Sequence, residues 1–254
     1  MRSLTALLAL VFAAGELPSQ VLNLSIWSLD TPEDNGSGNS RRVYHPALDK
    51  YDNKYLSVPS VGDKFVQLLV PVNGKTTPNS HYPRTEFREV KPNGKGSGDN
   101  MDFGLTGSHR LDATLAVMKL PPKRPGTAVG QLFGDGPCVM LGVKKQDNKY
   151  KISASNHFDN WNVNEIGVLD ADYKLGTKFS YSIAYQNGKL TISYNGKTVI
   201  NVDYKEDHQC NCKSGSDALC YFKAGNYLQT NTDYDNANDV GIVNVYSLST
   251  KHSS

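Results

Sequence analysis

Short segments of alternating apolar and polar residues make up most of this chain. Residues 110–118 are the clearest example, because Leu111, Ala113, Leu115 and Val117 place an apolar side chain at every second position. Successive side chains of a strand point to opposite faces, so this pattern predicts a strand with one buried face. Similar patterns predict strands at 21–29, 64–70, 128–133, 138–144, 150–154, 178–186, 189–194, 198–204 and 240–248.

Turn residues separate these segments, and no long helical pattern interrupts them. Residues 187–188 and 195–196 are both Asn-Gly, a pair that adopts positive φ readily and predicts tight hairpins. Residues 30–40, rich in Asp, Asn, Gly and Ser, predict a loop, and we expect residues 41–60 to be irregular. Many short strands without alternating helices are typical of an all-β antiparallel β-sandwich.

Composition limits the class of protein. The 254 residues, 38% of them hydrophobic, suffice for one domain with a sizeable core. The net charge of +2 and a pI near 8.2 are too mild for a nucleic-acid-binding protein. Any polyanion binding must therefore come from local placement of cations.

The N-terminus has the pattern of a secretory signal. Residues 1–15 contain an early arginine, an apolar run and a small-residue end, which predicts cleavage between residue 15 and about residue 20. Residues 16–254 then form a single secreted, extracellular domain. No other stretch approaches a membrane span, so we expect no membrane partner. Sequons at Asn23 and Asn35 predict N-glycosylation in a eukaryotic secretory pathway.

The cysteines fit an oxidising compartment. They are Cys138, Cys210, Cys212 and Cys220. Three pairings are possible and the sequence does not choose among them, although one disulfide within the last three and one to Cys138 suits the spacing. A Cys-x-Cys without accompanying histidines lacks zinc-site spacing, and the acidic residues of 30–40 match no calcium-loop template. We therefore expect no metal and no cofactor, with a structural calcium left open.

The segment 221–229 gathers polar chemistry on one strand face. That face holds Tyr221, Lys223, Tyr227 and Gln229, with Gly225 between them. The opposite face holds residues that we expect in the core, namely Phe222, Ala224 and Leu228. Two phenols, an ammonium and an amide above apolar backing suit the binding of an acidic sugar.

Two other segments have the same design. The even positions of 82–89 include Arg84, Glu86 and Arg88, and the segment 129–134 places Gln131 and Phe133 on one face. Three distant strands with aligned polar faces predict one composite groove.

At these segments the chain resembles the alginate lyases of polysaccharide lyase family 7. The family pattern is Arg-(Ser/Thr)-Glu-Leu-Arg, Gln-(Ile/Val)-His and Tyr-Phe-Lys-Ala-Gly-x-Tyr-x-Gln. Residues 84–88 read Arg-Thr-Glu-Phe-Arg, and 221–229 match at every specified position, but Phe133 replaces the family histidine. The resemblance extends from about residue 25 to residue 248 and implies a jelly roll whose concave sheet forms the substrate groove.

The resemblance implies cleavage of a 1,4-linked polyuronate such as alginate by β-elimination, leaving an unsaturated uronate end. A base removes the C5 proton and an acid protonates the departing C4 oxygen. We expect Arg84 and Gln131 to neutralise the uronate carboxylate, since preorganised donors act best where charge develops. Tyr227 is the proton-transfer candidate, because Lys223 and Arg88 would favour its phenolate.

The remaining candidates bind substrate or support the site. Tyr221 and Gln229 would line sugar subsites, and Glu86 would orient the two flanking arginines through salt bridges. In the family the missing histidine is thought to act as base when the C5 proton and the C4 oxygen lie on opposite faces, as in guluronate. Its loss favours mannuronate or glucuronate, where one tyrosine serves both steps, unless His81 replaces it.

Three alternatives stay open at this stage. Glucuronan is the competing substrate, and a non-catalytic uronan-binding jelly roll is the competing class. A glycoside hydrolase needs two carboxylates about 5–10 Å apart, and Glu165, Asp170 and Asp172 do not have the spacing that such sandwiches place on one strand. We therefore do not expect a hydrolase. The expected protein is a monomer whose partner is an acidic polysaccharide, with its cleavage pattern undetermined.

Overall fold

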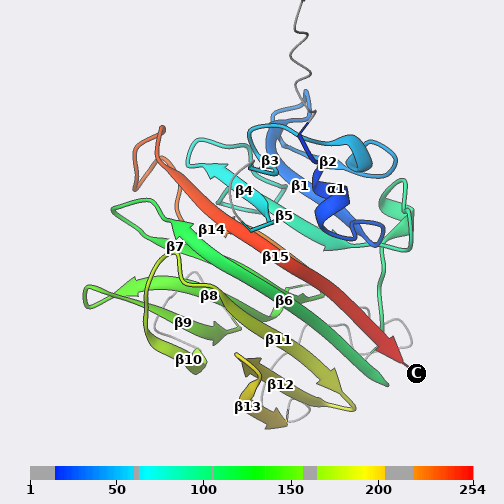
Figure 1. Cartoon of the computed structure of the whole chain (residues 1–254), viewed down its shortest axis with the longest axis vertical. Coiled ribbons are helices and arrows are strands. Elements are labelled where there is room, and N and C mark those ends of the chain that lie inside the picture. The colour runs from blue at the N-terminus through cyan, green and yellow to red at the C-terminus, as the bar shows by residue number, and fades with distance from the viewer. Residues whose placement is uncertain are drawn as a thin grey trace, which may run out of the picture.

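A computed structural model describes residues 15–59, 63–104, 106–134, 136–156, 165–203 and 220–253. Two antiparallel sheets pack face to face (Figure 1), which confirms the all-β sandwich. The proposed signal segment lies outside the described residues. Within the described ranges, no helix has the length and apolar character needed to cross a membrane.

The first sheet has eight strands in the order β10-β9-β8-β7-β14-β5-β1-β2. Their bounds are β1 Trp27–Asp34, β2 Ser40–Val43, β5 Arg84–Glu89, β7 Gly126–Phe133, β8 Pro137–Gln146, β9 Lys149–Ser155, β10 Glu165–Tyr173 and β14 Tyr221–Leu228. Strands from the first third, the middle and the end of the chain therefore meet at its centre.

The second sheet has seven strands in the order β13-β12-β11-β6-β15-β4-β3. Their bounds are β3 Leu56–Ser57, β4 Val66–Pro71, β6 Ser108–Lys119, β11 Phe179–Gln186, β12 Lys189–Tyr194, β13 Lys197–Asp203 and β15 Val240–Ser253. Helical turns are brief: α1 Pro18–Val21, η1 Leu48–Lys50 and η2 Ser97–Asp99.

The core lies between the sheets. The alternation predicted for residues 110–118 is confirmed, since Leu111, Ala113, Leu115 and Val117 of β6 are all buried. Across the interface, Phe87 of β5 and Phe222 of β14 are fully buried in the same cluster. Burying such side chains provides about 1.5–3 kcal/mol each, so the back of the groove is also the centre of the core.

Several local predictions can be compared with the structure. Both Asn-Gly turns are confirmed, with positive φ at Asn187 and Asn195. The strand expected at 21–29 is confirmed only over its last three residues, because α1 covers Pro18–Val21 and β1 begins at Trp27.

The loop expected at 30–40 is also wrong in its first half, since β1 continues to Asp34 and its polar residues pair with β2 and β5. Residues 41–60 are not wholly irregular, because β2 ends and β3 lies within them. The sequence did not predict β10, whose residues are mostly exposed or half-buried, since its apolar alternation is weak.

A glycine shapes the strand that carries the site. Gly225 has a φ of 150°, and a Cβ atom there would lie 2.7 Å from the Thr85 carbonyl oxygen and 2.9 Å from the Glu86 Cα. The backbones of β14 and β5 approach too closely for a side chain. On the β7 side, the pairing register of β14 shifts between Ala224 and Tyr227, which sets the position of the tyrosine.

Candidate active site

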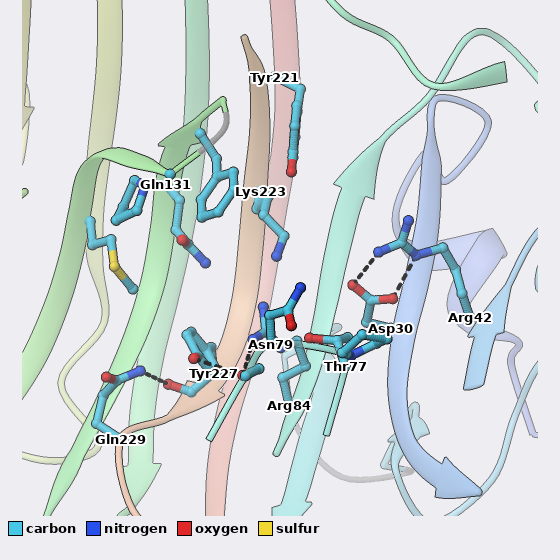
Figure 2. Close-up of a pocket in the computed structure, with 16 residues that line it drawn as sticks. Asp30, Arg42, Thr77, Asn79, Arg84, Gln131, Tyr221, Lys223, Tyr227 and Gln229 are labelled. Carbon is cyan, nitrogen blue, oxygen red and sulfur yellow. Dashed lines mark hydrogen bonds and ion pairs between the residues drawn. The ribbon is translucent and has the colours of Figure 1, made fainter. Parts of the chain in front are cut away.

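A groove of about 650 Å³ crosses the face of the first sheet that points away from the core (Figure 2). Side chains from β1, β2, β5, β7 and β14 and from the segment 77–80 line it. The predicted residues that line it are Arg84, Gln131, Phe133, Tyr221, Lys223, Tyr227 and Gln229. The structure thus brings together three segments that are far apart in the sequence.

Strand register explains this convergence. In β14, Lys223 lies opposite Arg88 of β5 and Gln131 of β7, while Tyr227 lies opposite Arg84. Directly paired residues in a sheet project to the same face. The polar alternation of each strand therefore becomes one continuous polar surface.

Glu86 is the buried centre of the cationic cluster. Its Oε2 accepts hydrogen bonds from Arg84 Nη1 at 3.1 Å and from Lys223 Nζ at 2.7 Å, and its Oε1 accepts one from Gln131 Nε2. The carboxylate side chain is fully buried. Because a carboxylate only accepts hydrogen bonds, the Gln131 amide must turn its nitrogen toward it. Glu86 therefore fixes the position of three groove-lining donors.

The protonation of this cluster follows from its burial. Burial lowers the pKa of the Lys223 ammonium to about 8, against the attraction of Glu86. Burial also acts to lower the pKa of Arg84, but the Glu86 carboxylate, with Tyr227 and Asp30, outweighs it and raises that pKa. At neutral pH the groove floor therefore carries two cations beside one carboxylate.

The Tyr227 hydroxyl lies at the groove surface beside a cation. It is 3.0 Å from the Ser80 hydroxyl, which in turn accepts a hydrogen bond from Arg84 Nη2 at 2.7 Å. The Arg84 guanidinium carbon lies 3.6 Å from the centre of the Tyr227 ring. A phenol held next to a guanidinium is suited to carry negative charge during proton transfer.

Arg88 does not occupy the predicted position. It does not line the groove; it pairs with Asp102 at 3.2 Å and lies 3.7 Å from the centre of the Tyr221 ring. Glu86 forms an ion pair with Arg84 but none with Arg88 among the described contacts. The cation beside Tyr227 is thus Arg84, because Arg84 pairs with Tyr227 whereas Arg88 pairs with Lys223, nearer the other end of β14.

The two tyrosines of β14 differ in environment. Burial raises the pKa of Tyr221, although Arg88 opposes the shift. Tyr221 also packs against Phe133, with ring centres 5.6 Å apart. These contacts suit a subsite wall better than a base.

Gln229 and His81 lie near one end of the groove. Gln229 lines it and donates to the carbonyl oxygens of Tyr227 and Leu228 at 3.2 and 3.0 Å. The His81 side chain is exposed and does not line the groove. Its imidazole packs against Tyr82 with ring centres 6.3 Å apart.

A second charged pair, which the sequence analysis did not predict, lies on the groove wall. Arg42 donates from Nε and Nη2 to the two carboxylate oxygens of Asp30, at 2.6 and 2.8 Å. Figure 2 shows this pair across the groove from Gln131. Burial acts to raise the pKa of Asp30, but Arg42 outweighs it and lowers that pKa. The alternation of Asp30 with buried Leu29 was the available signal, and it was obscured by the loop-like composition.

The metal and disulfide predictions concern other parts of the chain. In the ranges that the structure describes, no group of three or more His, Cys, Asp or Glu side chains is arranged to hold a metal ion. The buried sulfur atoms of Cys138 and Cys220 lie 3.8 Å apart. Cys210 and Cys212 lie outside the described residues, so the disulfide pairing stays a prediction.

The jelly-roll sandwich and its cationic groove define a class of proteins that act on acidic polysaccharides. The alginate lyase family matches residues 22–252 of this chain. The chain therefore belongs to the alginate lyases, those of polysaccharide lyase family 7, and is a polysaccharide lyase.

Solved structures agree with this assignment. The alginate lyase AlgAT5 from polysaccharide lyase family 7 is 30% identical, with a TM-score of 0.79 over 94% of this chain and 100% of that chain. The alginate lyase from Corynebacterium sp. is 26% identical, with a TM-score of 0.77 over 94% and 99%. A family 7 alginate lyase, A1-II′, in complex with substrate (GGMG) is 27% identical, with a TM-score of 0.72 over 95% and 97%. No curated protein matches the chain.

Proposed function

We propose that this protein is a secreted, monomeric lyase that cleaves mannuronate-rich alginate by β-elimination. One observation carries the substrate preference: Phe133 occupies the groove wall, and no histidine is among the described residues that line the groove. Tyr227 is then the group best placed to move protons.

The first step is neutralisation of the uronate carboxylate at C6. Arg84 offers a planar guanidinium, and Gln131 an amide that Glu86 holds in place. Lys223 adds a positive charge on the same face. As the C5 proton leaves, negative charge develops on the carboxylate, and fixed donors stabilise it without reorganising.

Tyr227 then performs both proton transfers. Its phenolate, stabilised by Arg84, removes the C5 proton, and the electron pair forms the C4–C5 double bond while the C4–O bond breaks. The phenol returns the proton to the departing oxygen. This requires both atoms to lie on one face of the ring, as in mannuronate. Guluronate presents them on opposite faces and needs a second group where Phe133 stands.

Glucuronan is the second candidate substrate, because glucuronate has the same one-sided arrangement and the same groove observation favours it. The similar family 7 alginate lyase A1-II′ was solved in complex with substrate (GGMG), which supports an oligosaccharide substrate for this chain as well. Incubation with polymannuronate, polyguluronate and glucuronan, followed by ultraviolet absorbance of the unsaturated product, tests the proposal.

We expect the fastest rise in absorbance on polymannuronate. A faster rise on glucuronan would make that polymer the substrate, and a preference for polyguluronate would contradict the single-tyrosine mechanism. Binding of alginate without any rise would favour the non-catalytic jelly roll.

A further inference from the structure

An exposed tyrosine in the connection between β14 and β15 lies beside an arginine in the connection between β6 and β7. The Tyr234 ring is 48% exposed, which makes it the one aromatic among the exposed large hydrophobic side chains of the described residues. The Arg124 guanidinium carbon lies 4.4 Å from the centre of this ring. We propose that Tyr234 and Arg124 form an outer subsite for a uronate unit several residues from the cleaved bond. The inference rests on the proposed function, since it extends the same substrate chain.

The loop that carries Tyr234 is held in place. The buried Asp235 carboxylate accepts hydrogen bonds from the backbone N–H groups of Lys123 and Arg124, at 2.7 and 3.1 Å, and from the Thr230 hydroxyl at 2.7 Å. The β14–β15 connection is therefore pinned to the β6–β7 connection, and Figure 1 shows both on the same side of the molecule. A fixed aromatic ring loses little conformational entropy when it binds a ligand.

Arg124 has the right surroundings to bind a carboxylate. Its Nη1 donates to the Tyr82 hydroxyl at 2.7 Å, and its guanidinium carbon lies 5.1 Å from the centre of the Tyr82 ring. The guanidinium is thus held between two rings, and no carboxylate side chain forms an ion pair with it among the described residues. A guanidinium oriented in this way retains donors for an anionic sugar.

Hydrogen bonds connect the segment that carries Tyr234 to the segment that lines one end of the groove. Gln229 and Ser80 both line the groove at its Tyr227 end. Two residues past Gln229, Asn231 Nδ2 donates to the His81 carbonyl oxygen at 3.4 Å, and Ser80 donates to the Tyr82 carbonyl oxygen at 3.3 Å. We therefore infer that a polyuronate that leaves the groove past Tyr227 reaches Tyr234 next. Only chains longer than the groove contact it.

The test compares Tyr234→Ala with wild type on two lengths of the same substrate. On long polymannuronate we expect KM to rise by about 3- to 30-fold, the range of one aromatic or cation contact, with kcat unchanged. On mannuronate trimers and tetramers, KM and kcat stay at wild-type values. Tyr234→Phe keeps the stacking face and retains the wild-type KM. Arg124→Gln gives the same length-dependent defect, provided that its melting temperature matches wild type.

Tyr246→Ala is the matched control. Lys178 Nζ lies 3.9 Å from the centre of the Tyr246 ring, so this ring also contacts a cation, but Tyr246 belongs to β15 of the second sheet. Affinity electrophoresis in gels containing polymannuronate separates this inference from the catalytic one. Weaker retention of Tyr234→Ala than of wild type supports the subsite even if no polymer is cleaved. Equal retention and equal KM on long polymer would overturn it, whatever the activity.

Discussion

The Arg84 guanidinium carbon lies 3.6 Å from the centre of the Tyr227 ring, and the Ser80 hydroxyl is within hydrogen-bond distance of both side chains. In the proposed mechanism, the cation that binds the substrate carboxylate therefore also touches the phenol that moves the proton. The proposal thus couples neutralisation of the substrate acid and proton transfer through one side chain, Arg84.

Removal of the Tyr227 hydroxyl should abolish most activity without unfolding the protein. A positioned acid or base contributes about 10²–10⁴-fold to rate, so we expect Tyr227→Phe to lower kcat on polymannuronate by that factor. Retention in alginate gels should persist, because the carboxylate-binding groups are intact. Tyr221→Phe, the other groove-lining phenol of β14, is the control and should lose far less. A kcat for Tyr227→Phe near that of wild type would exclude the tyrosine as base.

The Ser80 hydroxyl should affect the rate of proton transfer by Tyr227. Loss of one hydrogen bond costs about 0.5–1.5 kcal/mol, so Ser80→Ala is expected to reduce kcat by about 2- to 10-fold, with a small change in KM. Thr77→Ala, a change in the same groove-lining segment, should leave kcat unaltered. Steady-state kinetics on polymannuronate distinguish the two variants, and equal kcat values would show that the serine does not act on Tyr227.

Loss of the Lys223 charge should weaken substrate binding at alkaline pH. Burial lowers its pKa to about 8, so its positive charge is lost as pH rises through that value, and KM for an anionic polymer should increase. Arginine stays protonated above pH 12, so Lys223→Arg should remove this rise in KM between about pH 7 and 10. An unchanged pH profile in the variant would assign the weaker binding to another group.

The same shift predicts the effect on stability. Because the folded pKa lies below the value of an unfolded lysine, near 10.4, the unfolded chain binds more protons between these two values. The free energy of unfolding contributed by Lys223 should therefore increase as pH rises from about 8 to 10. Urea titrations of wild type and Lys223→Met across this range measure the contribution, and parallel pH dependences would contradict it.

Phe133 should control substrate stereochemistry. A histidine at this place on the groove wall adds a second proton-transfer group, so Phe133→His is expected to gain activity on polyguluronate while retaining cleavage of polymannuronate. Phe133→Leu is the control, since it opens space without adding a titratable group. Gain of polyguluronate cleavage in both variants would indicate that space, and not chemistry, excludes this polymer.

Glu86 should be required for stability as well as for positioning. Removal of one partner of a buried ion pair costs about 3–5 kcal/mol, because the other charge stays buried. Glu86→Gln leaves Arg84 and Lys223 without their carboxylate, so the midpoint of urea unfolding should fall accordingly. The double variant with Lys223→Met should recover part of the loss, and additive losses would show that the two residues are not coupled.

Much of the site could be predicted because polar and apolar residues alternate along its strands. Tyr221, Lys223, Tyr227 and Gln229 were expected on one face, and all four line the groove. Arg88 satisfies the same alternation yet points to Asp102 outside the groove. Alternation along a strand predicts which face a side chain is on. It does not predict how far along that face the groove extends.

The sequence by itself determined the all-β sandwich, the Asn-Gly hairpins and the polar faces of β5, β7 and β14. These features depend on the alternation of polar and apolar residues and on the backbone preferences of single residues. Both are determined by residues that are close together in the sequence. The tertiary structure decided that Ser80 joins Arg84 to Tyr227 and that Asp30 pairs with Arg42 across the groove wall. Such contacts join residues as many as 147 positions apart. They depend on strand order, register and loop closure, which arise only when the two sheets pack around their common core.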